Sequence, residues 1–185
     1  MNVNYLDELK KIIRNKALVI SNDESFELAS GGKSNYFFDM KLVSLDPKGV
    51  NLIAQAIFDR IKEYNDVSYI GGLESGAIPI VTAVCMISLK NGRPLFGFYV
   101  RKEPKKRGTR KLIEGNLEKG EKVVVVDDVT TKGSSVIKAI NAIRDFGCEV
   151  VKVISIVDRE AGARENFRNI GVDFESLFTK SDFGL

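Results

Sequence analysis

The stretch from Lys122 to Ser135 constrains the fold of this chain more than any other. It reads KVVVVDDVTTKGSS, so four consecutive valines lead into two aspartates and then into a loop of small hydroxylated residues. A β-branched run this short, apolar on both faces, is typical of a parallel strand that is covered by helices. The stretch therefore predicts a buried strand, a short loop and a helix that begins near Ser134, within an α/β fold.

The end of this strand is also a candidate ligand site. In open α/β sheets, ligands bind beyond the carboxyl ends of the strands, and backbone N–H groups at the start of a helix can surround a phosphate. Asp127 and Asp128 repel a phosphate, but carboxylates accept hydrogen bonds from sugar hydroxyls or hold a hydrated Mg²⁺ ion. Phosphate beside hydroxyls describes a ribose 5-phosphate, whereas an ordinary strand, turn and helix with solvated acids is the alternative. The residues that fit the phosphate role are Thr130, Thr131, Gly133, Ser134 and Ser135.

Composition narrows the chemistry that this site can perform. The chain has 185 residues, no histidine and a net charge of +3. The lack of histidine excludes Ser-His-Asp catalysis, His-ligated zinc and histidine acid-base chemistry. Cys85 and Cys148 are isolated thiols that suit a reducing cytoplasm, and no apolar run reaches the roughly 18 residues of a membrane helix. We expect a single domain over residues 1–185, located in the cytoplasm, without a membrane partner.

Several further segments have clear periodicity or capping signals. An amphipathic helix is expected at the amino terminus, followed by short strands at Ala17–Ile20 and Ser25–Leu28 around an Asn22-Asp23 turn. Asp46-Pro47 is a helix cap with proline in the first turn, so a helix is expected over about Pro47–Tyr64. Further helices are expected at Ala77–Leu89 and Ser134–Phe146. Further strands are expected at Val67–Ile70, Leu95–Val100, Glu149–Val157 and Phe174–Phe178.

Two of these strands are expected to bring further polar groups to the same edge of the sheet. Val67–Ile70 precedes the glycine-rich loop Gly71–Gly76, which is a second candidate anion-binding loop. Glu149–Val157 leads into Asp158-Arg159-Glu160. The planar guanidinium of Arg159 can grip a substrate carboxylate with two hydrogen bonds, or it can pair with a neighbouring acid on the surface.

The segment from Arg101 to Lys111 contains seven basic residues and one acid, with Pro104 and Gly108 opposing a regular helix. A solvated loop or a nucleic-acid patch is one interpretation of such a segment. The other is a cluster of cations for a diphosphate leaving group. We favour the second, because the segment lies between two expected sheet strands.

The segment ASGGKSNYFFDMK contains a Gly-Gly-Lys-Ser run that resembles a nucleoside-triphosphate loop. We reject that interpretation because Glu27 occupies the position of the required first glycine. The aromatic residues Tyr36, Phe37 and Phe38 can pack on a planar ligand, with Lys33 nearby. They can equally be strand residues that anchor an amino-terminal subdomain.

Together these motifs resemble the type I phosphoribosyltransferases, and in particular their orotate-specific branch. VVVVDDVTTKGSS is similar to the superfamily's signature for phosphoribosyl diphosphate (PRPP), while SGGKSNYFFD, RKEPKKRGT and VDREAG are similar to motifs of the orotate branch. The resemblance implies a central, mainly parallel sheet flanked by helices. It also implies a small hood subdomain over about residues 1–40 and a mobile basic loop over about residues 101–115.

The resemblance further implies a reaction and an assembly. The ribose 5-phosphate of PRPP would be transferred to N1 of orotate, giving orotidine 5′-monophosphate and diphosphate in the de novo synthesis of pyrimidine nucleotides. Mg²⁺ would be the cofactor, bound chiefly through PRPP, and no protein residue is assigned as its ligand. The protein would be a homodimer in which the basic loop reaches the neighbouring site, with no nucleic-acid partner.

The resemblance also assigns roles to individual residues. Catalysis would fall to Lys105, Arg101, Asp127 and Asp128, with the two aspartates at the ribose hydroxyls. Orotate would be bound by Thr131, Arg159, Phe37 and Phe38. PRPP would be bound by Arg101, Lys102, Lys105, Arg107, Asp127, Asp128, Val129, Thr130, Thr131, Lys132, Gly133, Ser134 and Ser135.

This chain departs from many bacterial members of the family in its cations. Arg107 stands where they carry histidine, and Ala29 and Ser75 stand where they carry lysines. Lys132, at a position often held by a small residue, adds a cation beside the 5-phosphate.

Two other functions are compatible with the same motifs. One is a PRPP-dependent transferase for another base, such as a purine, although Arg159 argues against it because a purine has no carboxylate. The other is a PRPP-sensing regulator that binds nucleic acid through Arg101–Lys111, with the steep salt dependence that phosphate contacts produce.

Overall fold

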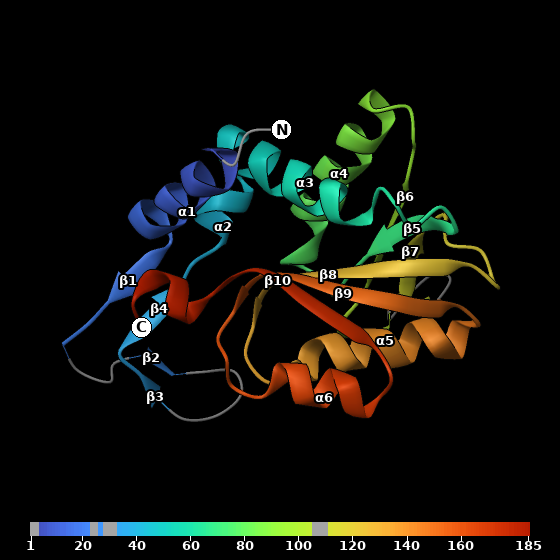
Figure 1. Cartoon of the computed structure of the whole chain (residues 1–185). Coiled ribbons are helices and arrows are strands. Elements are labelled where there is room, and N and C mark those ends of the chain that lie inside the picture. Colours follow the sequence, from blue (N-terminus) through green and yellow to red (C-terminus); the bar gives the residue numbers. More distant parts are fainter. Residues whose placement is uncertain (1–3, 23–25, 28–32, 105–110) are drawn as a thin grey trace.

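The computed structural model describes residues 4–22, 26–27, 33–104 and 111–185. A six-stranded sheet lies at its centre, with helices on both faces (Figure 1). Neighbouring strands are parallel except for β6 and β7, which are antiparallel, so the predicted α/β class with a mainly parallel sheet is confirmed. The strand order is β10-β9-β8-β5-β6-β7. The strands are β5 Val67–Gly71, β6 Phe96–Val100, β7 Ile113–Gly115, β8 Lys122–Thr130, β9 Glu149–Asp158 and β10 Asp173–Thr179.

The valine run of β8 is buried on both faces of the sheet, as its sequence predicts. Val123, Val124, Val125 and Val126 are all fully buried. Successive side chains point to opposite faces, so Val124 and Val126 join one core while Val123 and Val125 join the other. Burying a valine contributes about 1.5–3 kcal/mol relative to leaving it exposed, so this strand fixes both helical layers to the sheet. Those layers contain α3 Pro47–Ile61 and α4 Ala77–Lys90 on one face and α5 Ser134–Phe146 and α6 Ala163–Asn169 on the other.

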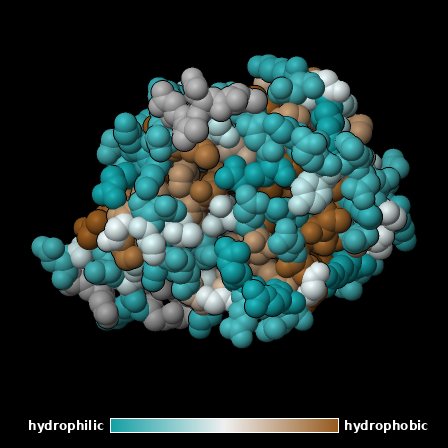
Figure 2. All heavy atoms as spheres, in the orientation of Figure 1, coloured by the Kyte–Doolittle hydropathy of each residue, from teal (hydrophilic) through white to brown (hydrophobic). Residues whose placement is uncertain are grey.

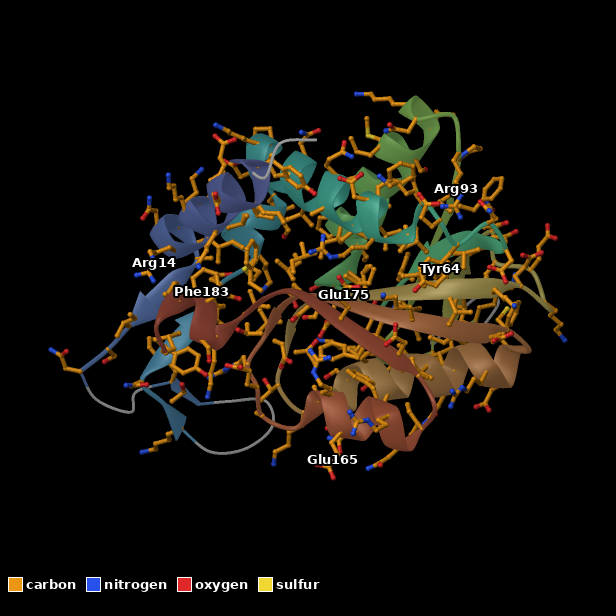
Figure 3. The ribbon with its side chains drawn as sticks, in the orientation of Figure 1. Arg14, Tyr64, Arg93, Glu165, Glu175 and Phe183 are labelled. Carbon is orange, nitrogen blue, oxygen red and sulfur yellow. The ribbon has the colours of Figure 1, made fainter. Side chains whose placement is uncertain are left out.

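The amino-terminal elements lie beside the end of the chain (Figure 1). The carbonyl oxygen of Phe183 accepts a hydrogen bond of 2.6 Å from the guanidinium of Arg14 (Figure 3). The Phe183 ring packs edge-on against the Phe38 ring, with the ring centroids 5.2 Å apart. These contacts hold the amino-terminal elements over the carboxyl edge of the sheet. The predicted action of this region as a hood stays a prediction. Its elements are α1 Asn4–Lys16, β1 Leu18–Ile20, β2 Phe26–Glu27, β3 Lys33–Ser34, β4 Tyr36–Phe38 and α2 Lys41–Ser44, and the final turn is the 3₁₀-helix η1 Lys180–Phe183.

Some element boundaries differ from the sequence predictions. The strands at Ala17–Ile20 and Ser25–Leu28 were expected around one turn, but β1 pairs with β4 and β2 pairs with β3. The helix expected over Pro47–Tyr64 ends at Ile61, where the guanidinium of Arg93 donates hydrogen bonds to carbonyls of Ile61, Tyr64 and Val67. Its amino-terminal cap is as predicted, because the Asp46 side chain accepts hydrogen bonds from the backbone N–H groups of Lys48 and Gly49.

Candidate active site

The residues that follow the valine run surround a pocket of about 140 Å³. The helix α5 begins at Ser134, and the first backbone N–H group to bond within it belongs to Ile137. Within the described part of the chain the preceding N–H groups have no hydrogen-bond partner, so they can bind an anion, and the helix dipole favours negative charge there. Asn166 of α6 holds the loop from outside by donating a hydrogen bond of 2.8 Å to the Lys132 carbonyl. The pocket is lined by Asp127, Val129, Thr130, Thr131, Lys132, Gly133, Ser134, Ser135 and Val136.

Thr130 contributes to this pocket differently from its neighbours. The strand was expected to end at the acids, but β8 continues to Thr130 because it pairs along its whole length with β9. The Thr130 side chain is buried, and its hydroxyl donates a hydrogen bond of 2.8 Å to the Asp127 carboxylate. It also lies 3.0 Å from the fully buried hydroxyl of Ser155 on β9. The Thr130 hydroxyl is therefore used inside the sheet, where it supports Asp127.

The two acids lie in a poorly hydrated position. Burial, reinforced by the charge of Asp128, raises the pKa of Asp127 to about 7, although the Thr130 hydrogen bond opposes the shift. Burial also raises the pKa of Asp128, whose carboxylate accepts a hydrogen bond of 2.8 Å from the Val129 N–H. Gly76 approaches so closely that a Cβ atom there would lie 2.8 Å from the Asp128 carboxylate. The oxygen atoms of these two carboxylates can therefore accept hydrogen bonds from a ligand.

The raised pKa of Asp127 predicts a pH dependence for the use of PRPP, the substrate that the sequence resemblance implies. Below pH 7 the free protein increasingly holds Asp127 protonated, so kcat/KM for PRPP should fall about tenfold per pH unit. The Asp127→Asn variant should lack this acid limb, because its side chain does not titrate. Initial rates between pH 5.5 and 8.5 measure both profiles, and an identical limb in the variant would assign it to another group.

The same shift predicts the pH dependence of stability. A carboxyl with a raised folded-state pKa stabilises the fold fully below its ordinary pKa of 3.8, and this contribution is lost as the pH rises through about 7. Raising the pH from 5 to 8 should therefore lower the unfolding free energy of the wild type relative to that of Asp127→Asn.

The first glycine-rich loop, residues 71–76, holds the start of the basic segment. Glu74 accepts a hydrogen bond of 2.9 Å from the Lys102 backbone N–H, and its carboxylate lies 3.8 Å from the Arg101 guanidinium. Arg101 and Lys102 therefore begin beside the loop that faces Asp128. Ser75 is exposed in the same loop. The predicted residues Lys105 and Arg107, and the departure at Ala29, lie outside the described residues.

Arg159 follows β9 and is held in a fixed orientation. Its side chain is only 6% exposed and stacks on the Tyr36 ring at 4.4 Å. Its guanidinium donates hydrogen bonds to the Ser34 hydroxyl at 2.9 Å and to the Tyr36 hydroxyl at 3.3 Å. Among the described residues Arg159 has no carboxylate partner, so the surface ion pair considered from the sequence is not present there.

A second pocket, of about 290 Å³, adjoins the first. It brings together Thr131 and Arg159, two of the four residues predicted to bind orotate. Phe38 is 4% exposed and belongs to the core, so it has almost no surface left for a ligand. Phe37 is 39% exposed but stacks on Phe26, with the ring centroids 5.9 Å apart. The lining is Lys33, Ser34, Asn35, Tyr36, Thr131, Arg159, Ala161 and Lys180.

Comparison with known proteins agrees with this geometry. The phosphoribosyl transferase domain family matches residues 45–173. A protein of Aquifex aeolicus named orotate phosphoribosyltransferase is 42% identical over 176 residues, covering 95% of this chain and 96% of that protein. The chain belongs to the orotate phosphoribosyltransferase family. A second protein of that name, from Bradyrhizobium diazoefficiens, is 44% identical and covers 84% of this chain and 85% of its own length.

Solved structures of the orotate phosphoribosyltransferase family share the fold. The Mycobacterium tuberculosis orotate phosphoribosyltransferase in complex with PRPP superposes with a TM-score of 0.79 at 33% identity, covering 98% of this chain and 99% of that chain. The same protein in complex with Fe(III) dicitrate gives a TM-score of 0.84 at 34% identity, with the same coverage. The expectation of a type I phosphoribosyltransferase fold is therefore confirmed.

Proposed function

We propose that this chain transfers the ribose 5-phosphate of PRPP to N1 of orotate, giving orotidine 5′-monophosphate and diphosphate in de novo pyrimidine synthesis. The observation that carries the proposal is the junction of the two pockets, because Thr131 lines both of them. One pocket offers backbone N–H groups for a phosphate, and the other offers a fixed, buried guanidinium for a carboxylate. A ribose bound between them would meet a carboxylate-bearing base at its anomeric carbon.

The described residues would divide the chemistry between binding and charge stabilisation. Asp127 and Asp128 would accept hydrogen bonds from the ribose hydroxyls, and residues 131–135 would surround the 5-phosphate. As the bond to diphosphate breaks, the ribose gains oxocarbenium character and the leaving group gains negative charge. Arg101 and Lys102, together with Lys105 and Arg107 beyond the described residues, would stabilise that charge more in the transition state than in the ground state.

Magnesium belongs to the proposal as a substrate-bound ion. Among residues 4–22, 26–27, 33–104 and 111–185, no group of three or more His, Cys, Asp or Glu could hold a metal ion. The donors that suit Mg²⁺ are hard oxygens, and a diphosphate supplies several of them. When bound there, the ion would neutralise charge on the leaving group.

We further propose a cytoplasmic homodimer in which the basic segment reaches the partner's site. Most of the surface in Figure 2 is hydrophilic, but brown apolar patches interrupt it. Met86 and Leu89 of α4 and Phe96 of β6 are each more than half exposed. The basic segment, residues 101–111, begins directly after β6. A partner subunit that packs against Met86, Leu89 and Phe96 would therefore lie close to the start of this segment. No helix in the described part of the chain is long and apolar enough to cross a membrane.

The decisive experiment follows the loss of orotate absorbance when the purified protein is mixed with PRPP and Mg²⁺. We expect turnover that needs PRPP and stops in EDTA. The Lys105→Ala variant should be slower by about 100-fold, the usual effect of removing one group that stabilises transition-state charge. Turnover with adenine or hypoxanthine instead would support a transferase for another base. Salt-sensitive RNA binding without PRPP consumption would support the regulator.

A further inference from the structure

The register of the sheet places three side chains in a row at its carboxyl edge. Thr130 on β8 pairs with Asp158 on β9, and Asp158 pairs with Thr179 on β10. The next residue of each parallel strand is Thr131, Arg159 and Lys180, and all three line the 290 Å³ pocket. Nothing in the sequence motifs points to Lys180, because it belongs to the last turn of the chain.

The backbone around Lys180 is held firmly. Its preceding residue, Thr179, forms a capping box with Asp182, in which the Asp182 carboxylate accepts hydrogen bonds from the Thr179 N–H at 2.8 Å and hydroxyl at 3.2 Å. Ser181, on the other side, donates hydrogen bonds from its N–H and its hydroxyl to the Glu160 carboxylate. Glu160 directly follows Arg159, so these contacts fix the two cationic residues relative to each other.

The Lys180 ammonium group is available for a ligand. The side chain is half-buried, and it forms no ion pair or side-chain hydrogen bond with the described residues. Burial raises the pKa of the nearby Asp158 carboxyl, and the positive charge of Lys180 is one of the interactions that oppose this rise. Asp158 also accepts a hydrogen bond of 2.8 Å from the Glu160 N–H. Lys180 therefore stands at the pocket wall as a cation whose hydrogen-bond donors are unused within the described part of the chain.

Arg159 by itself leaves a carboxylate incompletely bound. Tyr36 occupies its Nε–H group, and Ser34 occupies one hydrogen of Nη2. The donors that remain lie along the Nη1 and Nη2 edge of the guanidinium, while an ionised carboxylate can accept about four hydrogen bonds. A second cation beside Arg159 would donate further hydrogen bonds to the substrate carboxylate.

We infer that Lys180 is a specificity-determining residue that binds the ring carboxylate of the pyrimidine substrate together with Arg159. The inference rests on the proposed function and deepens it. It predicts that the pocket distinguishes a pyrimidine that carries a carboxylate from one that lacks it through two cations from adjacent strands.

The test uses two nucleotides that differ only in this carboxylate. Orotidine 5′-monophosphate carries it and uridine 5′-monophosphate does not, so the ratio of their dissociation constants measures carboxylate recognition without any reaction. Titration calorimetry would be performed on the full-length wild type and on Lys180→Met, Lys180→Arg and Lys119→Met. Lys119 is an exposed lysine that precedes β8 at the opposite edge of the sheet, so its substitution removes the same charge away from the pocket.

Loss of a charge-assisted hydrogen bond should weaken binding of orotidine 5′-monophosphate to Lys180→Met about tenfold or more, with uridine 5′-monophosphate affected less than about twofold. Lys180→Arg should restore most of the preference, and Lys119→Met should keep all of it. An unchanged ratio in Lys180→Met, or an equal loss for both nucleotides, overturns the inference. Wild-type turnover of orotate is measured in parallel, and its absence would refute the proposed function instead.

Discussion

Replacement of Arg159 by methionine is expected to lower kcat/KM for orotate by about 100- to 1,000-fold, the effect of removing one partner from a buried charge pair. Arg159 is buried, and Ser34 and Tyr36 fix its guanidinium at the wall of the 290 Å³ pocket. Methionine keeps most of the apolar stem but supplies no donor. PRPP should still bind, because residues 131–135 and Asp127 line the adjoining pocket. Initial rates at varied orotate, with PRPP-dependent thermal shifts, measure the two effects separately.

A matched control separates this effect from the loss of any structural arginine. Arg144 on α5 donates a hydrogen bond of 2.9 Å to the Ile170 carbonyl, far along the helix from the pocket residues. Arg144→Met should therefore lose some stability and retain orotate turnover. Arg159→Lys should remain strongly impaired, because an ammonium group cannot reproduce the planar fork that Ser34 and Tyr36 orient. Unchanged orotate turnover in Arg159→Met would show that Arg159 does not bind orotate.

The parts of the fold that were predicted correctly depend on local sequence. The four valines of β8 indicate burial on both faces wherever the strand is placed, and Gly147 ends α5 in the left-handed conformation that glycine favours. The sequence predictions differ from the structure where pairing between segments that are distant in the sequence determines the extent of a strand. The pairing with β9 extends β8 past its acids to Thr130, and β7 is a three-residue strand that exists through its pairing with β6.

The candidate site shows the same division. The family resemblance assigned Thr131 and Arg159 to orotate, and the common edge at which parallel strands end predicted that such polar groups lie close together; the two residues do line one pocket. Tyr36, Phe37 and Phe38 were considered together as aromatic residues that can pack on a planar ligand, and the family resemblance assigned Phe37 and Phe38 to orotate. Of these three residues, Tyr36 is the one that lines the pocket. Lys180 could not be predicted, because only the β9–β10 register brings the last turn of the chain beside Arg159.

The Gly133→Ala variant is expected to lose both stability and PRPP affinity. Gly133 has φ of +77°, and a Cβ atom there would lie 2.6 Å from the ring of Phe167. The left-handed backbone costs about 1–2 kcal/mol for an L-residue, and overpacking a core adds about 1–3 kcal/mol. Phe167 is fully buried and packs on Phe174, so its ring has little room to move. The loop before α5 must shift instead, which displaces the N–H groups that would bind the 5-phosphate.

Gly162→Ala provides the control for this prediction, because Gly162 has a similar conformation without the steric overlap. Its φ is +101°, and a Cβ atom at this residue would meet no other atom of the described residues within 4 Å. Gly162→Ala should therefore lose only the backbone contribution, while Gly133→Ala should unfold about 6–12 °C below the wild type for a loss of roughly 3 kcal/mol. PRPP affinity should fall only in Gly133→Ala, as measured by titration calorimetry. Equal thermal shifts for the two variants, with unchanged PRPP affinity, would show that the close approach of Gly133 to Phe167 does not position the loop before α5.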